Sequence, residues 1–332
     1  MTTTQSWQDF LQQQSSSTPD LSAQLTACAN GTVITDLSNR GLIKLTGDDA
    51  VTFLQGQLTN DIKALNGTNS QFAGYCTAKG RLLALFFAFS VNGAIYLQLN
   101  RTLTESIIKR LKMFVLRSKV TISDESKTVR IGLAGNSAVH LLAKFFPNVP
   151  ETPHTLTRHE NTVVIRLPSV TPMFEMVTDE NQAATLCTSI NTECKFISEE
   201  AWNWLEIQAG IPDISAETQE AFVPQMLNLD ALGGINFKKG CYTGQEIVAR
   251  THYLGSVKRR TQLAHIQSET EPKAGEDILD SNQQAVGQIV RVSRAINSGF
   301  DVLAECRLEN IEQGKVYWQT HALEIKALPY TL

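Results

Sequence analysis

The chain has 332 residues, 42% of them apolar, and carries 29 Lys and Arg against 33 Asp and Glu, for a net charge of −4. This length allows two or three domains with sizeable cores. Nucleic-acid binders usually carry a basic field that contacts phosphates, so the mild acidity argues against direct RNA binding.

The sequence also predicts the cellular location of the protein. The start MTTTQSWQDFLQQQSSSTPD has no basic region followed by an apolar run, as a secretory signal would. The most apolar stretch, residues 82–91, is ten residues long, whereas a membrane-spanning helix needs roughly twenty. The six cysteines form no Cys-x-x-Cys pair, which argues against a disulfide framework or a resident metal. We therefore expect a cytoplasmic protein with no membrane segment.

The first half of the chain predicts a mixed α and β region after a polar amino-terminal arm over residues 1–19. The apolar spacing predicts strands at 33–38, 42–47, 72–77, 82–90 and 94–99. It also predicts a helix that places Val51, Leu54 and Leu58 on one face. A second helix is expected over 103–116, with a buried stripe made of Leu103, Ile107, Leu111 and Phe114.

The second half changes from mixed elements to strands alone. Strands are expected at 129–134, 162–167 and 173–177, and helices at 138–146, 181–189 and 199–209. The last of these helices ends at Gly210 with Pro212 just beyond, as helix carboxyl ends often do. After residue 258 only short strands and turns follow, which indicates a small β-barrel or sandwich.

The strongest candidate for chemistry is LGGINFKKGCYTGQEIVAR at residues 232–250. Its glycines allow tight turns and close approach to a ligand. Lys238 and Lys239 precede Cys241, and a helical pattern begins near Gly244. Nearby cations and a helix amino terminus favour the thiolate form of a cysteine, which predicts a reactive or ligating thiol. These residues alone leave open the alternative that Cys241 is a buried structural cysteine.

The string Lys-Gly-Cys-Tyr-Thr-Gly-Gln-Glu at residues 239–246 resembles the signature of the YgfZ family. This family is described as tRNA-modifying, folate-binding relatives of the glycine-cleavage T-protein, an aminomethyltransferase. Residues 55–61, 78–80, 222–225, 228–235 and 328–330 are also similar to the family, so the likeness runs from residue 32 to the end. The motif residues that accompany Cys241 and Lys239 are Gly240, Tyr242, Gly244, Gln245 and Glu246.

The resemblance implies an α+β, aminomethyltransferase-like folate-binding fold with two intertwined α+β domains and a carboxyl-terminal β-barrel. We accordingly expect a folate-binding region over 20–250, with 46–119 as an inserted subdomain, and a barrel over 251–332. The cofactor implied is folate, as tetrahydrofolate or a derivative. Trp202 matches a folate-contacting tryptophan of the family, and an indole face stacks well on a flat pterin. The residues alone instead favour Trp202 and Trp204 as core aromatics.

Three departures from the related proteins matter. Arg40 stands where some members have tryptophan, and a guanidinium can stack or pair with the glutamate tail of folate. Gln208 stands where aminomethyltransferases have a glutamate, so hydrogen bonding to the pterin is retained without the charge. The run at 80–85 lacks the aspartate that aminomethyltransferases place there, so the group needed for proton handling is missing. Glycine-cleavage chemistry is therefore not expected.

The resulting hypothesis is a folate-binding accessory protein that supports iron–sulfur enzymes and thereby tRNA modification, without autonomous activity. In it, Cys241 is the reactive or ligating thiol and Lys239 favours its thiolate. Its partners would be iron–sulfur enzymes or assembly proteins, and the acidic charge argues against direct tRNA binding. The alternatives are a tetrahydrofolate-dependent one-carbon transferase and a non-catalytic, folate-sensing regulatory protein. A nucleophilic Cys241–His252 pair would need a side-chain geometry that the sequence spacing alone does not establish.

Overall fold

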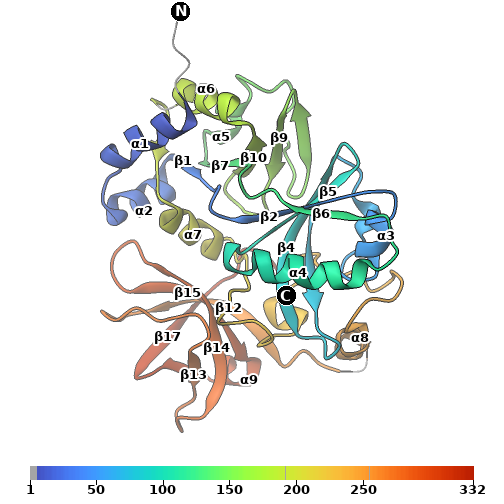
Figure 1. Ribbon diagram of the computed structural model, residues 1–332. Coiled ribbons are helices and arrows are strands. Elements are labelled where there is room, and N and C mark those ends of the chain that lie inside the picture. Colours follow the sequence, from blue (N-terminus) through green and yellow to red (C-terminus); the bar gives the residue numbers. More distant parts are fainter. Residues whose placement is uncertain (1–5, 191, 254) are drawn as a thin grey trace, which may run out of the picture. The chain divides into compact units, whose positions relative to one another are not determined.

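The computed structural model describes residues 6–190, 192–253 and 255–332 and divides the chain into two compact units. Unit 1 takes residues up to 39 and 126–209, and unit 2 takes residues 40–125 and 210–332. The chain therefore passes between the units after residues 39, 125 and 209. This interleaving of two α+β units confirms the expected fold class (Figure 1).

Unit 1 is built on a six-stranded sheet with the order β11-β1-β7-β10-β9-β8. β1 pairs in parallel with β11 and antiparallel with β7, and the remaining neighbours are antiparallel. The strands are β1 (Thr32–Asp36), β7 (Val129–Gly135), β8 (Leu156–His159), β9 (Thr162–Arg166), β10 (Met173–Thr178) and β11 (Lys195–Phe196). The central strands β7, β9 and β10 are buried along their whole length, which explains their apolar sequences.

The helices of unit 1 complete its core. They are α1 (Trp7–Ser17), α2 (Leu21–Asn30), α5 (Ala138–Leu142), α6 (Glu180–Ile190) and α7 (Glu199–Gln208). The region expected to be a polar arm instead contributes to the core, because Trp7 and Phe10 of α1 are each 2% exposed and pack among its apolar residues. Ser6 caps this helix by accepting a hydrogen bond from the Asp9 amide at 3.1 Å. Residues 1–5 of the expected arm lie outside the described residues.

Unit 2 contains an antiparallel five-stranded sheet with the order β3-β4-β5-β2-β6. Its strands are β2 (Gly41–Thr46), β3 (Ser70–Cys76), β4 (Leu82–Val91), β5 (Ala94–Leu99) and β6 (Thr121–Asp124). Its helical segments here are α3 (Ala50–Gln55), η1 (Ile62–Ala64), η2 (Arg101–Leu103) and α4 (Thr104–Val115). Leu103, Ile107 and Leu111 are buried as expected, but Phe114 is 45% exposed, so the predicted stripe is wrong in its last turn.

The carboxyl-terminal part of unit 2 is a closed six-stranded barrel with the order β12-β15-β14-β13-β16-β17, as expected (Figure 1). Its strands are β12 (Arg259–Ile266), β13 (Asp277–Leu279), β14 (Ala285–Arg294), β15 (Phe300–Arg307), β16 (Tyr317–Trp318) and β17 (His321–Lys326), with the short helix α9 (Leu308–Glu312). Its interior is filled by apolar side chains, including Ile289, Phe300 and Trp318.

The connection between this barrel and the sheet of unit 2 carries η3 (Pro224–Leu227) and α8 (Gln245–Tyr253). An ion pair joins Arg260 of β12 to Asp230, with Nη2 and Oδ2 2.9 Å apart. The Leu82 amide at the start of β4 donates to the Phe222 carbonyl at 2.8 Å. These contacts hold residues 220–230 against both parts of unit 2. Among the described residues, no helix combines the length and apolar character needed to cross a bilayer.

Candidate functional site

Two segments that the sequence analysis singled out separately, residues 55–61 and residues 232–244, lie together in unit 2. We call residues 232–244 the Cys241 loop. The buried hydroxyl of Thr59 donates to the Gly234 carbonyl at 2.7 Å, and the side-chain amide of Asn60 donates to the Gly233 carbonyl at 2.7 Å. The Asn236 amide in turn donates to the Thr59 carbonyl at 3.0 Å. Buried polar groups are thus satisfied across the two segments, which fixes the loop's path.

Lys239 makes the densest set of contacts between the two segments. Its ammonium donates to the carbonyl oxygens of Gln55, Leu58 and Asn60 at 2.8, 2.6 and 2.8 Å. A lysine ammonium has three N–H donors, so these carbonyls use all of them. Any influence of Lys239 on Cys241 would therefore act through charge and through the shape of the loop.

The surroundings of Lys239 are partly apolar. Its ammonium lies 5.1 Å from the centre of the Tyr242 ring, within the range of a cation–π contact. Burial lowers the pKa of Lys239 to about 8, while the negative charge of Asp61 opposes that shift. Burial, with a smaller effect of Cys76, raises the pKa of Tyr242, so its phenol stays neutral at physiological pH. The two motif residues that flank Gly240 and Cys241 thus anchor the loop.

Gly244 occupies a position that only glycine fits. Its φ is +84°, and a Cβ placed on it would lie 2.4 Å from the Thr77 carbonyl oxygen and 2.9 Å from the Gly80 Cα. Gly80, at φ +70°, forms the β3–β4 turn that packs against this point. A Cβ on Gly240 would meet nothing within 4 Å. The motif therefore contains one glycine required by backbone packing and one that is sterically free.

Cys241 is exposed and lies four residues before α8 begins at Gln245. No hydrogen bond from another described residue reaches its sulfur. The motif residues Gln245 and Glu246 form the first turn of α8, with Gln245 half-buried and Glu246 exposed. The other five cysteines, all in the described part of the chain, are buried, and burial raises the pKa of each: Cys28, Cys76, Cys187, Cys194 and Cys306.

The end of α8 adds aromatic groups to this surface. His252 stacks on Phe237 of the Cys241 loop, with ring centroids 3.7 Å apart and planes 12° from parallel. Tyr253, which is 63% exposed, contacts Phe237 edge-on. His252 is therefore engaged with an aromatic ring, and no hydrogen bond joins it to Cys241 within the described residues. Ile247, on the same helix, is 38% exposed.

Trp202 and Gln208 both lie on α7 in unit 1. The Trp202 ring is 0% exposed, and its indole N–H donates to the Glu206 carboxylate at 3.2 Å. A Cβ placed on Gly132 of β7 would lie 2.7 Å from this ring, so glycine makes room for it. Trp202 thus presents no open face for stacking in this structure, and its folate contact stays a prediction. Gln208 is the half-buried last residue of α7.

Arg40 belongs to a polar cluster of unit 2 that the sequence analysis missed. The carboxylate of Asp213 accepts hydrogen bonds from the Asn100 side chain and the Ile214 amide, both at 2.8 Å. Burial raises the pKa of Asp213, and the charges of Arg291 and Arg40 and the Asn100 hydrogen bond oppose this shift. Arg40 therefore lies close enough to the Asp213 carboxylate to affect its pKa, and its contact with the folate tail stays a prediction. No local pattern around Asp213 points to these distant partners.

The described residues contain no group of three His, Cys, Asp or Glu side chains arranged to hold a metal ion. No protein-family model matches the chain. The fold is that of the glycine cleavage system aminomethyltransferase T from Bartonella henselae, whose crystal structure aligns with a TM-score of 0.74. That alignment covers 93% of this chain and 89% of the other at 15% sequence identity.

Sequence relatives give the family. The chain is 33% identical to the tRNA-modifying protein YgfZ of Yersinia pseudotuberculosis serotype IB (strain PB1/+), over 93% of this chain and 96% of that protein. It is 32% identical to the tRNA-modifying protein YgfZ of Escherichia fergusonii, over 89% and 92% of the two chains. The chain belongs to the YgfZ family, as its motif at 239–246 indicated.

Proposed function

We propose that this chain is a folate-binding accessory protein that supports iron–sulfur enzymes and thereby tRNA modification. Its relatives are named tRNA-modifying proteins, and its fold is that of an aminomethyltransferase of the glycine cleavage system. The folate and iron–sulfur parts of the proposal rest on the family resemblance. An indirect role also agrees with the net charge of −4, which offers no basic field for RNA.

The observation that carries the proposal is the exposed thiol of Cys241 in a loop whose backbone is held by buried hydrogen bonds. Reactive cysteines need access to solvent or substrate, whereas buried cysteines are inert. The five other cysteines are buried, which leaves Cys241 as the thiol that a partner can reach.

One thiolate supplies one ligand to iron, whereas protein-bound clusters are usually held by four cysteines. Cys241 would therefore act in a transient contact, with the remaining ligands coming from a client or assembly protein. The exposed Tyr253 and Ile247 on α8 offer apolar surface for such a partner next to the loop.

The proposal is tested with Cys241→Ser in cells that lack the endogenous protein. We expect the variant to accumulate normally but to fail to restore the activity of iron–sulfur enzymes and tRNA thiomethylation. Cys194→Ser, a buried cysteine of unit 1, serves as the matched control and should restore both if it folds. Full restoration by Cys241→Ser would exclude the role of the thiol.

Folate binding is tested by fluorescence titration with tetrahydrofolate and with tetrahydropterin, which lacks the glutamate tail. Charge-assisted contacts to carboxylates contribute about 1.5–3 kcal/mol, so Arg40→Gln should weaken tetrahydrofolate roughly 10- to 100-fold and leave tetrahydropterin unchanged. Trp202→Phe, in parallel, tests the predicted aromatic contact. The absence of tetrahydrofolate binding to the unmodified protein would remove the folate part of the proposal.

A second candidate, tetrahydrofolate-dependent one-carbon transfer, gains support from one observation. Burial raises the pKa of Asp213, which lies near Arg40 and is a titratable group of the kind that proton handling requires. Leu83 and Ala84, where aminomethyltransferases have a carboxylate, are buried in β4 and supply none. Turnover of tetrahydrofolate with candidate amines, lost in Asp213→Asn, would establish this activity, and no turnover in the unmodified protein would exclude it.

A further inference from the structure

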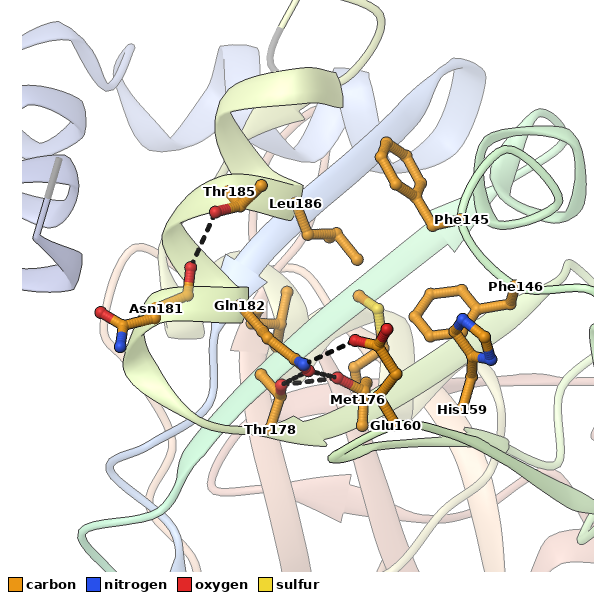
Figure 2. Close-up of a pocket in the computed structure, with 12 residues that line it drawn as sticks. Phe145, Phe146, His159, Glu160, Met176, Thr178, Asn181, Gln182, Thr185 and Leu186 are labelled. Carbon is orange, nitrogen blue, oxygen red and sulfur yellow. Dashed lines mark hydrogen bonds between the residues drawn. The ribbon is translucent and has the colours of Figure 1, made fainter. Parts of the chain in front are cut away.

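Unit 1 contains a cavity of about 350 Å³ that plays no part in the site around Cys241 (Figure 2). Its walls come from β7, β9, β10 and α6, from the segment after α5 and from the β8–β9 turn. Ligand pockets commonly measure about 300–1,000 Å³, so the cavity has room for a small molecule.

One side of the cavity is apolar and firmly packed. Ile131, Phe146, Met176 and Leu186 line it and also belong to the buried core of unit 1. The Phe146 ring meets the imidazole of His159 edge-on, with centroids 6.2 Å apart and planes 84° from parallel. Figure 2 shows Phe145, Phe146, Leu186 and Met176 arranged around the same space. Such a wall suits an aromatic or branched apolar group.

The opposite side is polar, and its hydrogen bonds are ordered. Gln182 Nε2 donates to Glu160 Oε2 at 3.0 Å, while Gln182 Oε1 accepts from the hydroxyls of Thr162 and Thr178 at 2.5 and 3.2 Å. A carboxylate only accepts hydrogen bonds, so Glu160 fixes which end of the Gln182 amide faces it. The Glu160 carboxylate is held in place beside the cavity, as Figure 2 shows.

The charges around the cavity favour a cation. Among the described residues that line it, Glu160, which is exposed, is the only carboxylate, and none is lysine or arginine. Arg158, whose Nε donates to the Glu160 backbone carbonyl at 3.0 Å, does not line the cavity. The amino terminus of α6 would favour an anion, but Asp179 caps it by accepting from the Gln182 amide at 2.9 Å, and Glu180 adds a negative charge in its first turn.

We propose that this cavity binds a small organic amine, with its apolar body against Phe146 and Met176 and its ammonium group beside Glu160. A charge-assisted contact to a carboxylate and an apolar floor together define this ligand class. The site would be independent of Cys241 and of folate, because all of its residues belong to unit 1 and it uses none of the predicted folate contacts.

The proposal is tested by ligand-observed NMR titration of the full chain with 2-phenylethylamine and with 3-phenylpropionate, its matched anion. We expect the amine to bind in the millimolar range or better, at least tenfold more tightly than the anion. Glu160→Gln should weaken the amine about tenfold and leave neutral 2-phenylethanol unchanged. Equal binding of the amine and the anion, or no amine binding up to 10 mM, would overturn the proposal.

A pair of variants on α6 tests whether the amine binds in this cavity. Thr185 lines the cavity and is exposed, so Thr185→Trp should obstruct it without disturbing the core. Thr188, also exposed and one turn further along α6, does not line the cavity, so Thr188→Trp is the control. Amine binding should be lost in the first variant and kept in the second, with helical circular dichroism unchanged in both. Binding that survives Thr185→Trp would show that the amine binds elsewhere.

Discussion

The Cys241 loop and helix α7 are built in opposite ways. In the loop, the backbone is fixed by buried hydrogen bonds from Thr59, Asn60 and Lys239, while the thiol itself is exposed. In α7, the large side chain of Trp202 is fully enclosed and its N–H is satisfied within the same helix. The exposed thiol can thus be reached from outside the protein, whereas the enclosed indole packs the core.

Removing the Trp202 ring should have the largest effect on stability. Trp202→Ala should lower the free energy of unfolding of unit 1 by about 4 kcal/mol, because the ring fills a space that the surrounding sheet cannot close. Urea unfolding, with hydrogen exchange at α7 and β7 amides, would measure this. A loss of unfolding free energy below about 1 kcal/mol would contradict the tight packing of the Trp202 ring, and a weakly packed ring would be available to stack on a ligand.

In the Cys241 loop, the largest effect is expected from Gly244→Ala. The added Cβ would meet the Thr77 carbonyl, and the left-handed backbone would be strained, for a combined cost of about 3 kcal/mol. Gly240→Ala is the matched control and should change the unfolding free energy by less than about 0.5 kcal/mol, because open space surrounds that position. Equal effects of the two substitutions in chemical denaturation would contradict the packing described at Gly244.

Acid should destabilise unit 1, because this unit contains His154, whose pKa burial lowers to about 4. The unfolded chain takes up a proton near pH 6.5 and the folded chain does not, so stability falls as the pH drops from 6.5 towards 4. The loss should approach about 3 kcal/mol. His154→Asn tolerates the left-handed backbone there (φ +65°) and removes the titration.

Urea unfolding of the unmodified chain and of His154→Asn at pH 7, 5.5 and 4 would give this difference. Unit 1 of the unmodified chain should lose more stability than the variant between pH 6.5 and 4. Parallel pH profiles of the two proteins would contradict a buried neutral imidazole.

The contacts of Lys239 predict a smaller, local effect. Lys239→Met leaves three carbonyl oxygens without their donor and should cost about 2 kcal/mol. Hydrogen exchange at the amides of 55–61 and 232–244 should rise in this variant. Lys238→Met, at the neighbouring exposed position, should change stability by less than about 0.5 kcal/mol. If both variants exchange alike, the three hydrogen bonds of Lys239 do not hold the loop.

The smallest change in stability is expected at the thiol itself. Cys241→Ser should leave the unfolding free energy within about 0.5 kcal/mol, since the side chain is exposed. A thiol reagent should label one cysteine of the unmodified native protein and none of the native variant. In the denatured unmodified chain it should label all six. Labelling of more than one native thiol would contradict the burial of the other five.

Much of the fold followed from periodicity and composition. The strands at 82–90 and 94–99, the helix at 199–209 and the run of strands after residue 258 all appear close to their expected positions. The predictions for Phe114 as buried and for α1 as a polar arm were wrong for related reasons. Residue spacing identifies the apolar face of a helix, but it does not say how much of that face the rest of the protein covers. Phe114 lies beyond the covered part, and Trp7 and Phe10 lie within it.

The site was only partly accessible from sequence. The glycines, the lysine pair and the helix start identified the Cys241 loop. The partners of Lys239 could not be found, because its carbonyl acceptors lie up to 184 positions away and backbone oxygens leave no sequence signal. Asp213 was missed for the same reason: its pKa depends on Arg291, Asn100 and Arg40, which come from three separate parts of unit 2.

The long separation between Lys239 and its acceptors also sets an order of events on the ribosome. The carbonyls of Gln55, Leu58 and Asn60 are made early, whereas Lys239 follows 184 residues after Gln55. At a synthesis rate of about 5–20 residues per second, this delay lasts on the order of 10–40 s. The sheet of unit 2 is therefore without the Cys241 loop until nearly three quarters of the chain have been synthesised.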